Sequence, residues 1–200
     1  MPSELYTCKI MGILHQGASR QLVPNEAGRP FRMADLEGNM VSLDSYRGSY
    51  LFLSFQRYAG CPLCNLRLHE LAEATPKLRA RGIEILAFME SPRKSILKAL
   101  KGEHLPYPII PDPELEVYRL YGVGSSWTGY LAGALRINKM YQAVVKHRLP
   151  MGKAEGEMAL LPAEFLIDPS GVVALAHYGR DIGDHLNLDR VIQRVLSPAL

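Results

Sequence analysis

The chain has 200 residues, of which 48% are hydrophobic and 22% are charged. A domain of this size and composition removes about 70% of its unfolded surface from water, which excludes a disordered, a collagen-like or a disulfide-dependent protein. The 23 Lys and Arg exceed the 20 Asp and Glu by only three charges, which is too small and dispersed an excess to predict a nucleic-acid partner.

The sequence carries no sign of a membrane or secretory destination. No stretch approaches the roughly 20 consecutive apolar residues of a membrane helix. The N-terminus lacks a basic region followed by an apolar core, and the three cysteines are an odd number, unusual for a secreted protein. We therefore expect a soluble cytoplasmic protein with no membrane partner.

The first expected elements are an N-terminal extension and a hairpin. Residues 1–22 contain an apolar run without a clear period. Two strand-like pieces, 31–36 and 40–43, follow with a turn signal around Gly38 between them, as in a β-hairpin. No linker or repeat interrupts residues 23–200, which are therefore expected to form one domain.

A strand–helix–strand unit is expected next. Residues 51–55 are almost entirely apolar, which is typical of a central strand covered on both faces. Residues 62–81 alternate apolar and charged positions with a helical period, and Pro76 predicts a kink or a break there. Because 83–89 is a second apolar run, the unit predicts two parallel strands.

The rest of the chain continues this α/β pattern. Residues 122–153 are irregular and are expected to be an insertion, whose basic stretch 135–148 predicts either a helix that docks a partner or forms a homodimer, or a solvated segment. The other elements expected are helices over 93–101, 113–121 and 187–196 and a hairpin of strands over 163–167 and 172–176.

Cys61 and Cys64 lie where the central strand ends and the long helix begins, the sheet edge at which α/β proteins bind ligands. Pro62 suits the first helical position, which makes Cys61 the N-cap. Unpaired N–H groups and the helix dipole favour a thiolate there. We expect an exposed Cys61 to be the nucleophile, and a less exposed Cys64 to resolve the resulting sulfenic acid or mixed disulfide.

Two other interpretations of the pair are a metal knuckle and a pair of inert thiols. Zinc requires four ligands, yet Cys8 lies 53 residues before Cys61 and His69 is poorly placed on the helix. The acids and histidine of 180–185 could also bind metal, but such a cluster is more typical of a turn with a helix cap. We expect no metal and no cofactor, and Cys8 as a bystander.

Several segments together resemble the peroxiredoxin-like branch of the alkyl hydroperoxide reductase and thiol-specific antioxidant family. The segments that carry the resemblance are 31–48, 54–57, 60–64, 161–171 and 178–185. The resemblance spans about 23–196 and implies a thioredoxin-like fold, with a central mixed β-sheet flanked by helices. It also implies an antioxidant enzyme that acts on hydroperoxides or disulfides and is reduced by a thioredoxin or glutathione system.

The resemblance also assigns a role to Pro162. It implies that Pro162 is the cis proline of the thioredoxin fold, which lies opposite the cysteines and leaves a backbone edge free for substrate. A proline that merely opens an edge strand is the alternative. The chain departs from a typical peroxiredoxin at Ser54 and Tyr58, where that family has Pro and Thr or Ser; Tyr58 is expected to position substrate.

Two charged residues complete the predicted site. Arg57 could stabilise a Cys61 thiolate or polarise a peroxide oxygen, although an arginine just after a strand can also be simply solvated. Glu90 follows the neighbouring parallel strand, so it is a candidate proton acceptor for Cys64; a helix-capping or solvated carboxylate is the alternative.

These observations predict a redox enzyme that cycles between a Cys61/Cys64 dithiol and disulfide. Whether its substrate is a hydroperoxide or a disulfide stays open at this point. The alternative function is a non-enzymatic thioredoxin-fold module that senses redox state or binds a partner.

Overall fold

The computed structural model describes residues 20–134, 152 and 156–197. Its main sheet has five strands in the order β5-β4-β3-β6-β7, in which β3, β4 and β5 are parallel and β6 is antiparallel to both neighbours. The mixed sheet and the parallel strand–helix–strand unit are therefore confirmed. The strands are β3 Tyr50–Gln56, β4 Ile83–Met89, β5 Ile109–Pro111, β6 Ala163–Ile167 and β7 Val173–Tyr178.

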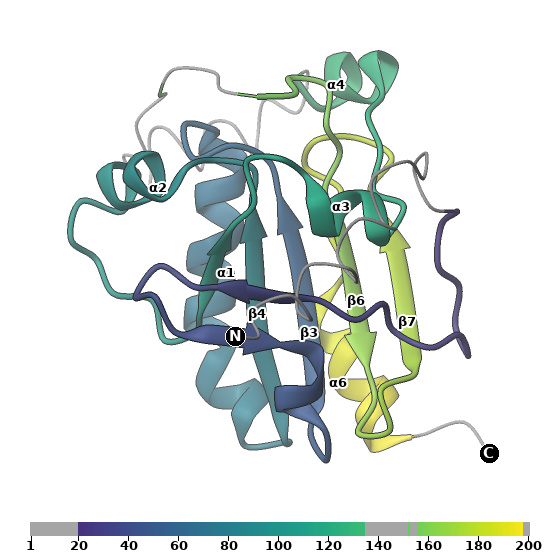
Figure 1. The fold of residues 1–200 in the computed structure, drawn as a ribbon. Helices are drawn as coiled ribbons and strands as arrows, with labels where there is room; N and C mark the ends of the chain where they lie inside the picture. The colour runs from purple at the N-terminus through teal and green to yellow at the C-terminus, as the bar shows by residue number, and fades with distance from the viewer. Residues whose placement is uncertain (1–19, 135–151, 153–155, 198–200) are drawn as a thin grey trace, which may run out of the picture.

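Two layers cover the faces of this sheet (Figure 1). Helices α1 (Pro62–Arg79), α2 (Arg93–Leu100) and α6 (Leu188–Leu196) pack on one face. The predicted hairpin, β1 (Arg32–Ala34) with β2 (Met40–Ser42), lies on the other face with the 3-10 helix η1 (Leu43–Tyr46) and with α3 (Glu116–Leu120). Helix α4 (Trp127–Ala134) lies beyond the end at which β3 finishes.

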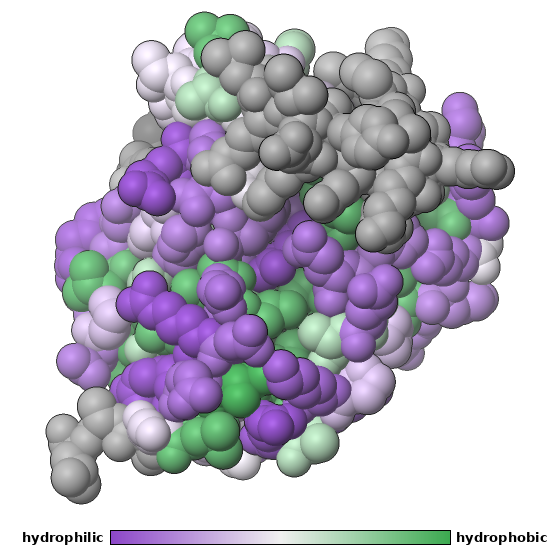
Figure 2. Space-filling view, turned by 180° about the vertical axis from the view of Figure 1, so that it is seen from behind, coloured by the Kyte–Doolittle hydropathy of each residue, from purple (hydrophilic) through white to green (hydrophobic). Residues whose placement is uncertain are grey.

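The apolar run of β3 forms the centre of the core because both of its faces are covered. Leu51, Leu53 and Phe55 pack toward the hairpin and α3, while Phe52 packs toward α1. Phe55 also stacks on Phe88 of β4, with ring centroids 4.8 Å apart. Each buried side chain of this kind contributes about 1.5 to 3 kcal/mol to stability. On the α1 and α6 side the outer surface is mostly hydrophilic, with separate apolar spots (Figure 2).

Two helices refine the sequence expectations: of the kink or break predicted at Pro76, the break is absent. Helix α1 is not broken at Pro76 and runs on to Arg79, and the preceding Thr75 hydroxyl donates to the Leu71 carbonyl at 2.8 Å. Helix α3 begins only at Glu116, because Leu115 has a left-handed φ of 55°. Asp112 still caps it, since its carboxylate accepts the N–H groups of Glu116 and Val117.

Part of the sequence expectations lies outside the described residues. Of the predicted extension only residues 20–22 are described, and Cys8 is not among them. Of the predicted insertion, 122–134 and Gly152 are described, so the basic stretch beyond α4 and its homodimer interpretation are not tested. Within the part of the chain that the structure describes, no helix is long and apolar enough to cross a bilayer.

Candidate active site

The cysteine pair lies at the first turn of α1, as its sequence context predicts. Cys61 is the N-cap, with extended backbone (φ −80°, ψ 116°), and Pro62 occupies the first turn. The carbonyl of Cys61 accepts the Asn65 N–H at 3.1 Å, and the Asn65 side chain donates to the Ala59 carbonyl at 2.8 Å. This side chain ties the strand-to-helix turn together. Cys64 follows one turn into the helix, and both thiols are free.

The expectation of an exposed Cys61 is wrong, because Cys61 and Cys64 are each only 2% exposed. Tyr58, Leu63 and Ile182 pack around both cysteines in one apolar cluster. Gly152 closes over the turn, where its N–H donates to the Gly60 carbonyl at 3.0 Å. A Cβ at position 152 would lie 2.7 Å from the Gly60 Cα, so the two backbones are in direct contact. Both cysteine side chains are therefore closed off from solvent in this structure.

The two thiols have opposite ionisation preferences. The Cys64 thiol, which donates a hydrogen bond to the Cys61 sulfur, is the main cause that lowers the pKa of Cys61 to about 6. Burial opposes this shift, while the Arg57 charge and the backbone N–H groups at the start of α1 support it. Burial and the hydrogen bond to Cys61 raise the pKa of Cys64 well above its ordinary value. The arrangement favours one thiolate and one neutral thiol.

Arg57 is not solvated: its side chain is only 1% exposed. It follows the last residue of β3, and its Nη1 lies 3.5 Å from the Cys61 sulfur, to which it donates. The Nη2 group donates to the Met158 carbonyl, and the rings of Tyr58 and Tyr130 lie 5.1 and 5.3 Å from the guanidinium carbon. A buried guanidinium needs a nearby negative charge, and a Cys61 thiolate supplies one.

Tyr58 is therefore placed against Arg57, and its role toward substrate stays a prediction. Its carbonyl accepts the Cys61 N–H at 3.0 Å, which helps to shape the turn. Burial raises the pKa of the Tyr58 phenol, so the hydroxyl is neutral at physiological pH.

Glu90 follows β4 and lies at the same end of the sheet, 3% exposed. Its N–H donates to the Arg57 carbonyl at 3.2 Å, and its Oε1 accepts the Glu157 N–H. Its Oε2 is buried and has no hydrogen-bond partner in the described part of the chain. Burial raises the pKa of this carboxyl to about 7. Glu90 can therefore exchange a proton near neutral pH, while its role toward Cys64 stays a prediction.

Pro162 directly precedes β6, and its position at the cysteine end of the sheet follows from the pairing of Ala163 with Phe55 of β3. The cis prediction is wrong: the peptide bond before Pro162 is trans, as are all the other described peptide bonds. The Leu161 N–H donates to the Gly124 carbonyl at 3.0 Å, and a β-bridge joins Ser125 to Leu160. The start of the insertion thus pairs with this backbone in place of the substrate that we expected.

A buried ion pair beneath α1 is a feature that sequence reasoning missed. Glu164 of β6 is fully buried, and its two carboxylate oxygens accept from Arg67 Nε at 2.8 Å and Nη2 at 2.9 Å. Although burial opposes ionisation, the Arg67 charge holds the pKa of Glu164 well below its usual range. Two sequence signals could have revealed this ion pair: the acidic residue Glu164 inside an otherwise apolar strand, and Arg67 on the long helix that faces it.

Polar side chains on both sides extend this ion pair. The Ser54 hydroxyl donates to Glu164 at 2.9 Å and accepts from Gln56 at 2.7 Å. The His185 ring lies 3.4 Å from Glu164, and the Leu186 N–H donates to the same carboxylate at 2.7 Å. Ser54, one of the two departures from a typical peroxiredoxin, therefore anchors a buried acid.

Residues 180–185 form a turn, which is the interpretation that their sequence favoured. The Asp184 carboxylate accepts the Arg180 N–H at 3.0 Å, and the Asp181 carboxylate accepts the Gly183 N–H at 2.9 Å. Within 20–134, 152 and 156–197, no three His, Cys, Asp or Glu side chains come together to hold a metal ion.

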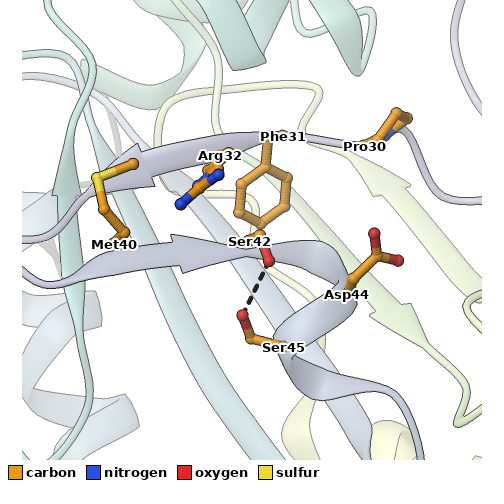
Figure 3. A pocket seen from close by; sticks show the side chains of 7 residues that line it. All are labelled: Pro30, Phe31, Arg32, Met40, Ser42, Asp44 and Ser45. Atoms are coloured by element: carbon orange, nitrogen blue, oxygen red, sulfur yellow. Dashed lines mark hydrogen bonds between the residues drawn. The ribbon is translucent and has the colours of Figure 1, made fainter.

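A broad, open hollow of about 530 Å³ lies elsewhere, on the β1–β2 hairpin and η1 (Figure 3). Ser42 and Ser45, two of the residues that line it, are joined by a hydrogen bond of 2.8 Å. None of the residues that line it belongs to the cysteine site. The hollow is therefore separate from the end of the sheet where Cys61 lies.

Two proteins of known structure share the overall fold of this chain. A Chlorobium tepidum protein provisionally named thiol:disulfide interchange protein DsbE superposes with a TM-score of 0.62 at 21% identity, over 88% of this chain and 99% of that one. The peroxidoxin BcpB of Mycobacterium tuberculosis superposes with a TM-score of 0.61 at 14% identity, over 88% and 96%. The thioredoxin-like fold is therefore confirmed.

The relatives found by sequence likewise include proteins named as thiol-disulfide oxidoreductases and as peroxiredoxins. The thiol-disulfide oxidoreductase ResA of Geobacillus thermodenitrificans is 33% identical over 102 residues, which is 50% of this chain and 58% of that protein. A Mycobacterium tuberculosis protein with a provisional peroxiredoxin name, MT2597, is 21% identical over 83% of this chain and 91% of its own length. The family model of AhpC/TSA matches residues 24–176, from before the hairpin into β7. With its cysteine pair at the start of α1 and its mixed sheet, the chain belongs to the AhpC/TSA family.

Proposed function

We propose that the chain is a thiol-disulfide oxidoreductase that cycles between the Cys61/Cys64 dithiol and disulfide. The observation that carries this proposal is the asymmetry of the pair: Cys61 is beside the buried Arg57 charge, whereas Cys64 is kept as a thiol. A low-pKa thiolate with a neutral thiol one helical turn away is the arrangement that attack and resolution require.

With a disulfide substrate, the Cys61 thiolate attacks one sulfur and forms a mixed disulfide, while the other substrate sulfur leaves as a thiolate. Cys64 then loses its proton and attacks the Cys61 sulfur, which releases the second substrate thiolate and closes the Cys61–Cys64 disulfide. The substrate gains two electrons and the cysteine pair loses two. With its pKa near 7, Glu90 is the proposed acceptor of the Cys64 proton.

A hydroperoxide is the second candidate substrate, and the contact between Arg57 and the Cys61 sulfur favours it. The thiolate attacks the terminal oxygen, the O–O bond breaks, and the released alkoxide takes a proton to leave as an alcohol. Cys61 becomes a sulfenic acid, and attack by Cys64 releases water and forms the disulfide. The Arg57 guanidinium can stabilise the negative charge that develops on the leaving oxygen.

The test of this mechanism uses single cysteine variants. Cys61→Ser is expected to abolish turnover with both an insulin-type disulfide and a hydroperoxide. Cys64→Ser is expected to trap Cys61 as a mixed disulfide or as a sulfenic acid. Mass spectrometry detects the mixed disulfide directly and the sulfenic acid after labelling with dimedone. Full turnover by Cys61→Ser would refute the proposed function.

The two substrate classes are separated by comparing initial rates. Reduced protein is mixed rapidly with hydrogen peroxide, with an organic hydroperoxide or with a protein disulfide, and oxidation of the pair is followed. We expect the protein disulfide to react fastest, because Ser54 and Tyr58 replace the residues that orient peroxide in typical peroxiredoxins. Oxidation-dependent partner binding without turnover of any substrate would favour the redox-sensing alternative.

The proposed reductant is a thioredoxin or glutathione system of the cytoplasm. The Cys61–Cys64 disulfide must be reopened by two electrons from an external thiol, since each turnover leaves the pair oxidised. Adding each system separately to the oxidised protein and quantifying free thiols identifies which one supports turnover.

A further inference from the structure

Arg57 is held by groups from separate parts of the chain. Its Nη1 faces Cys61, its Nη2 donates to the Met158 carbonyl, and aromatic rings lie near the guanidinium. Tyr58, one of these rings, is its neighbour in sequence. The other, Tyr130, comes from α4, which no sequence pattern had connected with the cysteines.

The distance from the Arg57 guanidinium carbon to the Tyr130 ring centroid is 5.3 Å, within the roughly 6 Å reach of a cation–π contact. Such contacts strengthen when the cation is shielded from water, and the Arg57 side chain is almost completely buried. The Tyr130 ring also packs against the apolar cluster that contains Cys61 and Cys64. The Tyr130 ring therefore contacts both the Arg57 guanidinium and the apolar cluster around the two cysteines.

Close backbone packing fixes the position of α4, and with it Tyr130. A Cβ at Gly129 would lie 2.6 Å from the Arg180 carbonyl oxygen, and a Cβ at Gly133 would lie 2.8 Å from the Ile182 nitrogen. The two glycines are four residues apart, so they share the helix face that meets this segment. The helix start is tied down as well, because the Ser126 N–H donates to the Ala159 carbonyl at 2.8 Å.

We propose that Tyr130 is a positioning residue that acts through Arg57: its ring holds the guanidinium beside the Cys61 sulfur. Helix α4 thereby sets the reactivity of the cysteine at the N-cap of α1. This inference rests on the proposed function, in which the Cys61 thiolate is the attacking group. Loss of the ring frees the guanidinium to turn away from the sulfur, and the thiolate then loses part of its stabilisation.

The test compares Tyr130→Phe with Tyr130→Leu in the reduced full-length chain. The rate of alkylation of Cys61 by iodoacetamide is measured against pH, with the modified residue identified by mass spectrometry. We expect Tyr130→Phe to keep the wild-type midpoint, because the aromatic face is retained. Tyr130→Leu is expected to raise the midpoint by about half a pH unit. Leu131→Ala is the matched control, since Leu131 is on the same helix and 62% exposed.

An unchanged midpoint in Tyr130→Leu would overturn the role of Tyr130, and an equal shift in Tyr130→Phe would overturn it by pointing to the hydroxyl. Neither outcome affects the proposed function, which fails instead if Cys61→Ser keeps full turnover. Circular dichroism of every variant verifies folding. If Tyr130→Leu does not fold, Tyr130→Met offers a similar volume with a more adaptable side chain and the same expected shift.

Discussion

Two regions of the molecule each hold a buried arginine and a buried glutamate at or near the first turns of α1, and they differ in how the charges are used. Under the helix, Arg67 and Glu164 form a bidentate ion pair. At the end of the sheet, Arg57 and Glu90 form no such pair: the guanidinium faces the Cys61 sulfur, and the carboxyl accepts a backbone N–H.

This difference separates two charges that neutralise each other from two that do not. Because Arg67 neutralises Glu164 directly, the acid stays ionised and its pKa lies well below its usual range. Glu90 has no partner of this kind within the described residues, and burial raises its pKa to about 7. The charge of Arg57 remains available to the thiolate. The same two residue types therefore stabilise the fold in one place, while in the other the Arg57 charge favours the Cys61 thiolate and the role of Glu90 toward Cys64 stays a prediction.

The largest effect is expected from breaking the structural pair. Arg67→Met leaves the Glu164 carboxylate buried without its arginine partner, which should lower the free energy of unfolding by about 3 to 5 kcal/mol. Urea denaturation measures this loss. The double variant Arg67→Met/Glu164→Gln removes both charges and should recover much of it. A loss below about 1 kcal/mol in the single variant would contradict the structural role of the pair.

Glu90→Gln tests the unpaired acid through the pH dependence of stability. The folded pKa of about 7 exceeds the ordinary value of 4.5, so protonation of Glu90 stabilises the fold at low pH. This contribution is present below pH 4.5 and is lost as the pH rises through 7. Relative to Glu90→Gln, the wild-type protein should therefore lose about 2 to 3 kcal/mol of unfolding free energy between pH 4.5 and pH 8.

Denaturation of both proteins at several pH values provides the measurement. Cys61, whose pKa is lowered, contributes with the opposite sign, but it titrates in both proteins and cancels in the difference. The amide of Gln keeps an oxygen that can accept the Glu157 N–H. Equal pH dependence in the two proteins would show that Glu90 is ionised as in water.

The smallest of the three effects is expected from Arg57→Gln. Without the guanidinium charge, the pKa of Cys61 should rise from about 6 by about one unit, which reduces the thiolate at pH 6 about fivefold. Alkylation rates against pH measure the shift. Arg57→Lys keeps the charge and should shift the pKa less. An unchanged pKa in Arg57→Gln would mean that the Cys64 thiol and the helix alone stabilise the thiolate.

The sequence by itself determined the parts of the site that depend on local structure. The run 51–55 predicts the central strand, and Pro62 after Cys61 predicts the helix start, because caps and first-turn prolines act over a few residues. The placement of Arg57 and Glu90 at one end of the sheet follows from the parallel strands that precede them. These features need only hydrophobic periodicity and the rules of strand connection.

Tertiary structure alone decided which groups distant in sequence come together. Glu164 meets Arg67 across 97 residues of sequence, and Tyr130 reaches Arg57 from a segment without a clear pattern. The burial of Cys61 likewise depends on segments that pack over it, which local propensity does not specify. Burial and charge pairing are properties of the assembled chain, since they require groups distant in sequence to exclude the same water.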